Sequence, residues 1–292
     1  MISFNADMTR YLPYLSGLFL ALLLGACATP PRTDDASRPI LADNSGEVAT
    51  SVEDCRDRLE RASPQPASGL VGSTVRLLNW NIKKGLVAEW QRDLDRFSGD
   101  RDLITIQEAV LDTDMLDRFD GARHWSFAKG YVRGSSTTGV ATIAPSRPLT
   151  ECHLVVIEPW LGTPKAINVT EYAMEDSNGT LVVVNVHAIN FTLGVERYRE
   201  QIRLMTQVLD AHAGPVIVSG DLNTWSERRI GIVDDFAAQA GLTGLSFESD
   251  DRTTVFGHQL DHVFFRGVEL VAAEARTVTT SDHNPILAEF RL

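Results

Sequence analysis

Short apolar runs of five to eight residues recur between positions 75 and 292, separated by turn residues and charged residues. Some of these runs, such as 181–184 and 216–218, are apolar at every position, which is typical of strands covered on both faces. The pattern predicts strands at 75–82, 103–107, 139–144, 153–157, 180–187, 215–219, 259–265 and 286–290.

The segment 195–212 carries the clearest helical pattern. Its apolar residues recur at intervals of three and four and so line one face of a helix: Val195, Tyr198, Ile202, Met205 and Leu209. A charged segment, 51–61, is also expected to form a short helix, although a solvated segment without regular structure would have the same composition.

Strands and helices follow one another here without strict alternation. This order predicts a layered α/β sandwich rather than a Rossmann sheet or a TIM barrel. Residues 74–292 are enough for one large domain. The chain has no P-loop and no GxGxxG segment, so nucleotide binding of those kinds is not expected.

The first 27 residues have the pattern of a targeting segment. Residues 11–26 are uncharged and largely apolar, Arg10 precedes them, and Leu-Gly-Ala-Cys ends at Cys27. This order is typical of a secretory signal, and its end resembles a bacterial lipobox. We therefore expect Cys27 to be lipidated and to anchor the mature protein to a membrane of the bacterial cell envelope. The alternatives are an ordinary signal peptide and an uncleaved anchor.

Residues 28–73 are predicted to form a tether, because five prolines and many small polar residues interrupt them. Two cysteines remain if Cys27 carries lipid, namely Cys55 and Cys152. In an oxidising compartment they could form a disulfide bond. Two unpaired buried thiols are an equally good interpretation of the sequence.

The composition narrows the class of protein further. The chain has 292 residues, of which 43% are hydrophobic and 23% charged, a balance that excludes a disordered protein. Its net charge of −12 argues against a protein that coats nucleic acid. An enzyme that contacts phosphate through a bound cation remains compatible with that charge. Three cysteines are too few for a disulfide-dense scaffold or a zinc ribbon.

Polar side chains gather where the predicted strands meet loops. Each of six strands has such a group at one end: Asn81, Gln107 with Glu108, Asn185 with His187, Asp221 with Asn223, Asp261, and Asp282 with His283. Taken alone, each has a plain structural explanation as a surface charge, a turn, a helix cap or a buried histidine. These explanations do not account for the recurrence of such groups at strand ends, and ligands of α/β proteins bind at such ends.

The segment Gly220-Asp-Leu-Asn223 shows the pattern in detail. Because side chains alternate in extended chain, Asp221 and Asn223 are expected to face one way and Leu222 the core. A carboxylate and a carboxamide on one face can hold a water molecule, a metal ion or a phosphate oxygen. Glu108 and Asn81 offer the oxygen ligands that Mg²⁺ prefers, which leaves the histidines for proton transfer or phosphate binding.

These motifs together resemble those of the endonuclease/exonuclease/phosphatase superfamily, which includes DNase I-like and exonuclease III-like enzymes. The matching segments occur in the order of the family and span 75–292: LLNWNI, LITIQEA, VVNVHAINF, VIVSGDLNTW, LDHVFF and SDHNPILAEF. Their detail is most similar to the YafD branch. The resemblance implies a four-layer α/β sandwich, in which two packed mixed β-sheets are flanked by helices.

The resemblance also implies a role for each matching residue. Glu108 would bind a divalent metal ion, Mg²⁺ or Mn²⁺, with help from Asn81 and Asp282. Asp221 would orient or deprotonate the attacking water, and Asn223 would hold that water or the phosphate. His187 and His283 would contact the phosphate, and Asp261 would orient His283 through its ring N–H. Relatives differ in which of these groups is the general base.

The implied reaction is metal-assisted, in-line attack of water on a phosphodiester or phosphomonoester bond. The simplest interpretation is a monomeric endonuclease or exonuclease acting on DNA or RNA. A phospholipid or inositol-phosphate phosphoesterase is an alternative, and a non-catalytic binding lipoprotein that keeps the fold is a second.

Two further patterns contain residue types that can bind a metal ion or a phosphate. His258 and His262 have the spacing of a helical zinc site, but this segment is predicted as strand, where four residues span ~13 Å, too far for one ion. We expect His262 to pack beside Leu260 and Phe264. Lys83 and Lys84 could attract a phosphate or could be an ordinary solvated pair.

Overall fold

The structure, a computed structural model, describes residues 48–62, 70, 73–111, 115, 118–119, 123–174 and 179–292. The predicted signal segment, Cys27 and residues 28–47 of the predicted tether lie outside these ranges. Among the described residues, no helix is long and apolar enough to cross a membrane.

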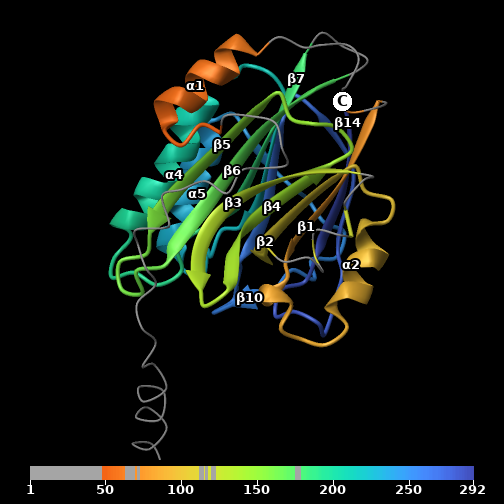
Figure 1. The fold of residues 1–292 in the computed structure, drawn as a ribbon, viewed down its shortest axis with the longest axis vertical. Helices are drawn as coiled ribbons and strands as arrows, with labels where there is room; N and C mark the ends of the chain where they lie inside the picture. The colour runs from red at the N-terminus through yellow and green to blue at the C-terminus, as the bar shows by residue number, and fades with distance from the viewer. Residues whose placement is uncertain are drawn as a thin grey trace, which may run out of the picture. The chain divides into compact units, whose positions relative to one another are not determined.

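Two six-stranded mixed sheets form the centre of the described fold (Figure 1). The first sheet has the strand order β13-β14-β1-β2-β4-β3 and the second the order β5-β6-β7-β8-β12-β9. The strands of the first sheet are β1 (Thr74–Asn81), β2 (Leu103–Val110), β3 (His124–Arg133), β4 (Ser136–Ala144), β13 (Glu269–Ala275) and β14 (Ile286–Arg291). The strands of the second are β5 (Thr150–Ile157), β6 (Pro164–Ala173), β7 (Thr180–His187), β8 (Val216–Asp221), β9 (Thr243–Gly244) and β12 (Asp261–Arg266).

Helices and short elements complete the layers. The helices are α1 (Val52–Arg61), α2 (Trp90–Ser98), α4 (Glu196–Leu209) and α5 (Glu227–Gln239), and one 3-10 turn, η2, covers Lys83–Gly85. A small hairpin of β10 (Thr254–Val255) and β11 (His258–Gln259) precedes β12. The predicted fold class, two packed mixed sheets flanked by helices, is confirmed.

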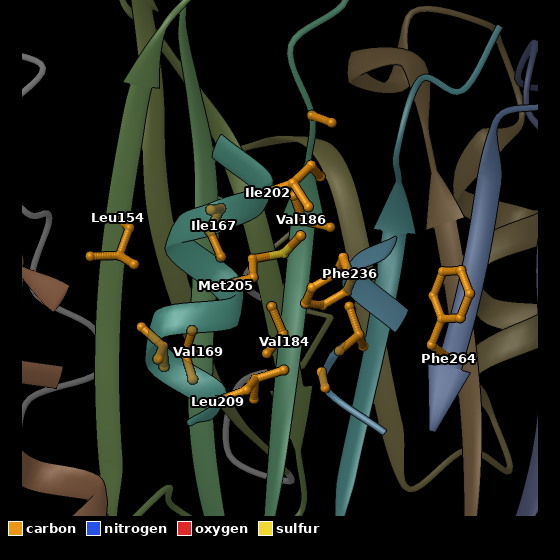
Figure 2. Packing of buried hydrophobic residues seen from close by; sticks show 14 of the residues in the cluster. Leu154, Ile167, Val169, Val184, Val186, Ile202, Met205, Leu209, Phe236 and Phe264 are labelled. Carbon is orange, nitrogen blue, oxygen red and sulfur yellow. The ribbon is translucent and has the colours of Figure 1, made fainter. Parts of the chain in front are cut away.

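Buried apolar clusters fill the spaces between the four layers. The cluster between the second sheet and its helices contains Val184, Val186, Ile202 and Met205, which interdigitate in Figure 2. Leu77 and Ile217 belong to the cluster between the two sheets. Burying one such side chain stabilises the fold by ~1.5–3 kcal/mol, so these clusters hold the layers together. The cluster on the outer face of the first sheet includes Leu78, Ile104, Leu94 and Phe97.

The predicted strands are present, with small shifts at their ends. The predicted strand 259–265 is interrupted, because Leu260 separates β11 from β12. The sequence pattern missed β3, β6, β13, α2 and α5. Of these, β13 is an edge strand with a bulge between Leu270 and Ala272, and five of its seven residues are small or charged. Such a strand lacks the apolar run on which a prediction depends.

The predicted tether needs a correction at residues 48–62. Ser51 caps α1 by accepting a hydrogen bond from the backbone of Asp54, as the charged helix predicted from the sequence requires. Ala49 pairs with Cys152 of β5, and Cys55 is joined to Cys152 by a disulfide bond. Part of the predicted tether is therefore built into the domain, because its buried residues and its disulfide hold it against the second sheet.

Candidate active site

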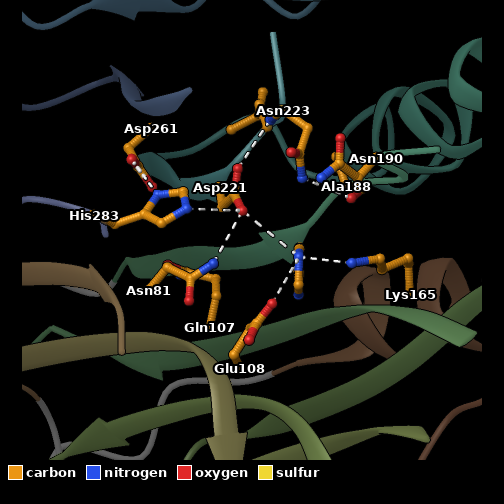
Figure 3. A network of polar contacts seen from close by, with 12 residues as sticks. Asn81, Gln107, Glu108, Lys165, Ala188, Asn190, Asp221, Asn223, Asp261 and His283 are labelled. Atoms are coloured by element: carbon orange, nitrogen blue, oxygen red, sulfur yellow. Dashed lines mark hydrogen bonds and ion pairs between the residues drawn. The ribbon is translucent and has the colours of Figure 1, made fainter. Parts of the chain in front are cut away.

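The site lies where the strands of the two sheets end, on the side from which β12 and β14 begin. In the second sheet, His187 is in register with Asp221, and Asp221 is in register with Asp261 on its other side. Their side chains thus form one row across three neighbouring strands, at the end of the sheet. Figure 3 shows Asp221 and Asp261 of this row, with Asn81 and Glu108 of the first sheet close to Asp221.

A buried polar network lies between the sheets just behind this row. Gln107 donates to Asn79 at 2.9 Å and to Asn185 at 2.7 Å, so it bridges the two sheets. Ser219 donates to Thr105 at 2.9 Å across the same gap. Asn79, Asn185 and Ser219 stand two positions before Asn81, His187 and Asp221, and alternation therefore directs these three site residues into the same gap. The network fixes how the two halves of the site face each other.

Gly220 lets the two central strands of the second sheet approach. A Cβ atom at this position would lie 2.0 Å from the carbonyl oxygen of Val186. The structure shows that this glycine makes room for β7, and that it thereby brings Asp221 into register with His187.

Glu108 is directed into the site by an irregularity in β2. Its φ is 52°, and the pairing of β2 with β4 shifts between Gln107 and Ala109. A bulge of this kind redirects one side chain. A glutamate with left-handed backbone angles is strained, and strained residues of this kind are found mainly at functional sites. Glu108 forms an ion pair with Lys84, whose own φ is 59°. Burial is the largest influence on Lys84 and acts to lower its pKa, but the hydrogen bond and the charge of Glu108, with a smaller contribution from Tyr131, together raise the pKa.

Asp221 is the centre of the polar contacts. Its carboxylate accepts from the side chain of Asn81 at 3.0 Å and from the backbone N–H of Asn223 at 3.0 Å. Its Oδ2 lies 3.5 Å from Nε2 of His187 and 3.9 Å from Nε2 of His283. Burial raises the pKa of Asp221 above its usual value, while the charge of His283 acts in the opposite direction. Such a carboxylate is a better proton acceptor than an exposed one.

The predicted contact between Asp261 and His283 is present. Nδ1 of His283 lies 2.7 Å from Oδ2 of Asp261 (Figure 3). Burial acts to lower the pKa of His283, but Asp261 and Asp221 outweigh it and raise the pKa to about 10. The backbone of His283 is also held, since Nε1 of Trp80 donates to its carbonyl at 2.8 Å. His283 is therefore a fixed imidazolium between two carboxylates.

His187 is neutral, unlike His283. Its Nε2 lies 2.8 Å from Nζ of Lys165, and because an ammonium can only donate, Nε2 accepts and the ring proton sits on Nδ1. Burial, with the charges of Lys165 and His283, holds the pKa of His187 well below its usual range. Burial also lowers the pKa of Lys165. The two site histidines thus differ in charge because their neighbours differ.

Three predicted site residues make contacts other than those expected. Asp282 pairs with Lys83 at 3.1 Å and is more than half exposed, so it lies at the rim of the site. Asn81 turns its carbonyl oxygen to the backbone N–H of Lys83 at 3.0 Å. Asn223 has a φ of 50°, so strand alternation does not apply to it, and its amide donates to Ala188 at 3.0 Å.

Two groups of side chains could hold a metal ion. Asp221, Asp261 and His283 bring three potential ligand atoms within 4.8 Å of one another. In this group the charged ring of His283 already lies between the carboxylates, with its Nδ1–H on Asp261, and a cation would have to displace that positive charge. The other set is Glu108 and Asp221, whose carboxylate oxygens suit a hard cation such as Mg²⁺ or Mn²⁺. Asn81 would have to turn its carbonyl oxygen away from the backbone N–H of Lys83 to join them. Lys84 supplies the positive charge next to Glu108 and would have to move.

The sequence analysis missed Lys165 and Arg229. Lys165 follows Pro164 at the start of β6, and a lone lysine in an apolar run was its only signal. Arg229 is fully buried and stacks between Tyr198 and Trp225. It donates to the carbonyl oxygen of Asn223 at 2.9 Å and so supports the loop after β8 from beneath.

The histidines of the doubtful zinc pattern have structural partners. His262 stacks on Phe264 with ring centroids 5.7 Å apart, as predicted, and its Nε2 lies 2.6 Å from the hydroxyl of Thr224. His258 lies 3.7 Å from Glu227. These contacts leave the pair without a common ligand position.

Comparison with known proteins agrees with this geometry. The profile of the Endonuclease/Exonuclease/phosphatase family matches residues 74–283. A UPF0294 protein of Vibrio vulnificus is 40% identical over 222 residues, which cover 75% of this chain and 78% of that protein. A UPF0294 protein of Yersinia enterocolitica is 38% identical over 220 residues, covering 74% and 84% of the two chains.

Several solved structures of low sequence identity share the fold. Danio rerio TDP2 complexed with a single-strand DNA product has a TM-score of 0.58 at 14% identity, covering 76% of this chain and all of that chain. The human Nocturnin catalytic domain with bound sulfate has a TM-score of 0.58 at 16% identity, covering 78% and 98%. At these identities the similarity concerns the fold.

Proposed function

Since this chain belongs to the Endonuclease/Exonuclease/phosphatase family, we propose that it is a divalent-metal-dependent hydrolase of phosphodiester bonds. The observation that carries the proposal is the convergence on Asp221. Its buried carboxylate lies beside a neutral histidine, His187, and an imidazolium, His283, and faces the carboxylate of Glu108. An acceptor for a proton and donors for developing negative charge thus meet at one place.

Each residue of this site has a role in the proposed reaction. Asp221 orients the attacking water and accepts its proton. His283, held by Asp261, donates hydrogen bonds to the phosphate oxygens as negative charge develops on them. His187 stays neutral beside Lys165, so the ammonium rather than the imidazole carries the positive charge on that side. A metal ion held by Glu108 would neutralise phosphate charge and assist the leaving group.

Nucleic acid is the first substrate class to test, because the similar TDP2 structure is described as containing a single-strand DNA product. A phospholipid headgroup is the second, and the net charge of −12 together with the apolar loops described below favours it. The full chain should be assayed on plasmid DNA, RNA, sphingomyelin, inositol phosphates and bis(p-nitrophenyl) phosphate, with Mg²⁺, Mn²⁺ or EDTA. Absence of metal-dependent hydrolysis of all these substrates would refute the proposal.

We further propose that Cys27 is lipidated and holds the protein at a membrane of the cell envelope. The apolar segment 11–26 and its Leu-Gly-Ala-Cys end support this. Mass spectrometry of the membrane fraction tests it, and a full-length chain with an unmodified Cys27 would refute it.

A further inference from the structure

Large apolar side chains are exposed around the mouth of the site. Among the described residues, eight large apolar side chains are markedly exposed, and six of them form what we call the apolar rim: Leu86, Trp160, Leu161, Phe191, Leu193 and Phe256. Their exposed fractions range from 51% to 83%. Exposed apolar groups that gather at one place mark an interaction surface.

Every rim residue stands close in sequence to a residue of the site. Leu86 follows Asn81, and Trp160 with Leu161 precedes Lys165. Phe191 and Leu193 follow His187, and Phe256 precedes Asp261, each within six residues. The strands that carry these site residues end or begin at the same end of the sheets, so the rim loops lie at the end that carries the site.

The loops of the rim are braced from beneath. Glu158 accepts from the backbone N–H of Asn190 at 2.8 Å and from that of Phe191 at 2.6 Å, which joins two rim loops. Nε1 of Trp225 donates to the side chain of Asn190 at 3.0 Å, and the Trp225 ring contacts Phe256 edge-on. The rim of the second sheet is thus one connected structure rather than a set of independent loops.

Phe256 is exposed on a strained backbone. It forms the two-residue turn of the β10–β11 hairpin with Gly257, and both have positive φ, 52° and 83°. Hairpin turns of this kind favour Asn-Gly, and a bulky residue with positive φ is a strained exception. Phe256 is nevertheless 83% exposed, so it gains little from burial within the chain. A strained and exposed aromatic at a loop tip points to a binding function.

The tips of the rim loops carry no charge. The segments 86–88, 159–163, 191–195 and 254–257 contain no Asp, Glu, Lys or Arg, although 23% of all residues are charged. A nucleic acid would require basic side chains at these positions. Uncharged tips with aromatic and aliphatic side chains suit the interface of a lipid bilayer, where tryptophan and phenylalanine insert with little electrostatic cost.

We propose that the apolar rim docks on a phospholipid bilayer and holds the active site against the lipid headgroups. The proposal rests on the proposed function for its choice of substrate, a phosphodiester within a phospholipid. The chain outside the described residues agrees with this occupant. About 20 residues separate Cys27 from Val48, enough for ~65–70 Å of extended chain. Val48 directly precedes Ala49, which pairs with Cys152 of β5. From Cys152, β5 extends only ~17 Å to Ile157, at the end of the sheet that carries the apolar rim.

Fluorescence of Trp160 tests the docking directly. The full chain is reconstituted into phosphatidylcholine vesicles with or without brominated acyl chains, which quench tryptophan only within the apolar interior. The chain has five tryptophans, and none lies in the first 79 residues, so the expected membrane anchor gives no signal. We expect brominated lipid to remove the share of emission that Trp160→Phe also removes, and the double variant Phe191→Ser with Phe256→Asn to prevent that loss. Asn suits the turn at 256, so this variant keeps the hairpin.

A matched control places a tryptophan elsewhere. Val271 is an exposed apolar residue of β13 near the end of the sheet opposite the site, and Val271→Trp in the Trp160→Phe chain should remain unquenched. Emission of Trp160 that brominated lipid leaves unchanged, or equal quenching at 160 and 271, would overturn the docking, including the case in which the rim binds a protein. Hydrolysis of bis(p-nitrophenyl) phosphate is measured in parallel. Its absence with quenching intact would refute the proposed function and leave the docking standing.

Discussion

Lys165 and His187 lie on neighbouring strands with their side-chain nitrogen atoms 2.8 Å apart. The lysine donates and the imidazole accepts, so the pair carries one positive charge, on the lysine. This arrangement separates the roles of the two site histidines, because His283 lies between Asp221 and Asp261 and is protonated.

The first prediction concerns Lys165→Met. Removing the ammonium removes one of the causes that depress the pKa of His187, so the pKa should rise toward its usual value. We expect turnover to fall by about 10-fold or more, as for the loss of one charged donor. The acid limb of the kcat/KM profile should move to higher pH. Lys165→Arg, which keeps the charge, is the control. A pH profile identical to that of the unmodified chain would contradict the prediction.

The second prediction concerns the pair of Asp261 and His283. Because the carboxylate acts through the imidazole, the two form one unit, and their losses should not add. Asp261→Ala and His283→Ala are each expected to lower turnover by roughly 10²-fold or more. The double variant should be little worse than the worse single variant. Losses that multiply in the double variant would show that His283 acts without Asp261.

The sequence could predict those site residues whose positions follow from local motifs, but not those whose positions depend on how strands pair. Asp261 and His283 were paired from the family motifs, and strand ends located Asp221 and Glu108. The bulge at Glu108 could not be predicted, because it depends on the pairing of β2 with β4. Lys165 requires the register of β6 against β7, which no local pattern encodes.

The same distinction holds for the fold. Strands buried on both faces, such as β7 and β8, have continuous apolar runs and were predicted within two residues. The helix α2 was missed because its buried side chains, including Leu94 and Phe97, alternate with charged residues over only nine positions. The packing of 48–62 on the domain depends on one disulfide and a few buried residues, and the many prolines around it favoured a tether.

The third prediction concerns the metal site. Glu108→Gln keeps the shape of the side chain and removes its charge, so metal-dependent turnover should fall by about 10- to 100-fold or more with the fold retained. Lys84→Met should have the opposite effect on metal binding. It removes the ammonium that neutralises Glu108, so half-maximal activity should need less Mg²⁺. Titration of activity with Mg²⁺ measures both, and unchanged activity of Glu108→Gln at limiting Mg²⁺ would place the metal elsewhere.

The fourth prediction concerns the disulfide between Cys55 and Cys152. It closes a loop with a sequence separation of 97 residues and joins α1 to β5. Replacing both cysteines with alanine should lower the free energy of unfolding by ~3–5 kcal/mol, mainly because the unfolded chain regains the freedom of that loop. Urea denaturation measures the loss. Cysteine-to-alanine chains that unfold at the same urea concentration as the unmodified chain would show that the bond contributes nothing to stability.

The last prediction is a dependence of stability on pH that does not involve the site. His153 is buried, its Nε2 lies 3.2 Å from the hydroxyl of Ser126, and burial lowers its pKa to about 4. In the unfolded chain the imidazole takes up its proton near pH 6.5, whereas in the folded chain it resists protonation until about pH 4.

Between these two values the unfolded state therefore binds more protons than the folded state. The contribution of His153 to stability is present above pH 6.5 and is lost as the pH falls through the window. By linkage the loss amounts to ~3 kcal/mol at most. His153→Gln cannot take up the proton, so its urea midpoint should fall less between pH 7 and pH 4 than that of the unmodified chain. Parallel declines of the two midpoints over this range would show that other groups dominate the acid sensitivity.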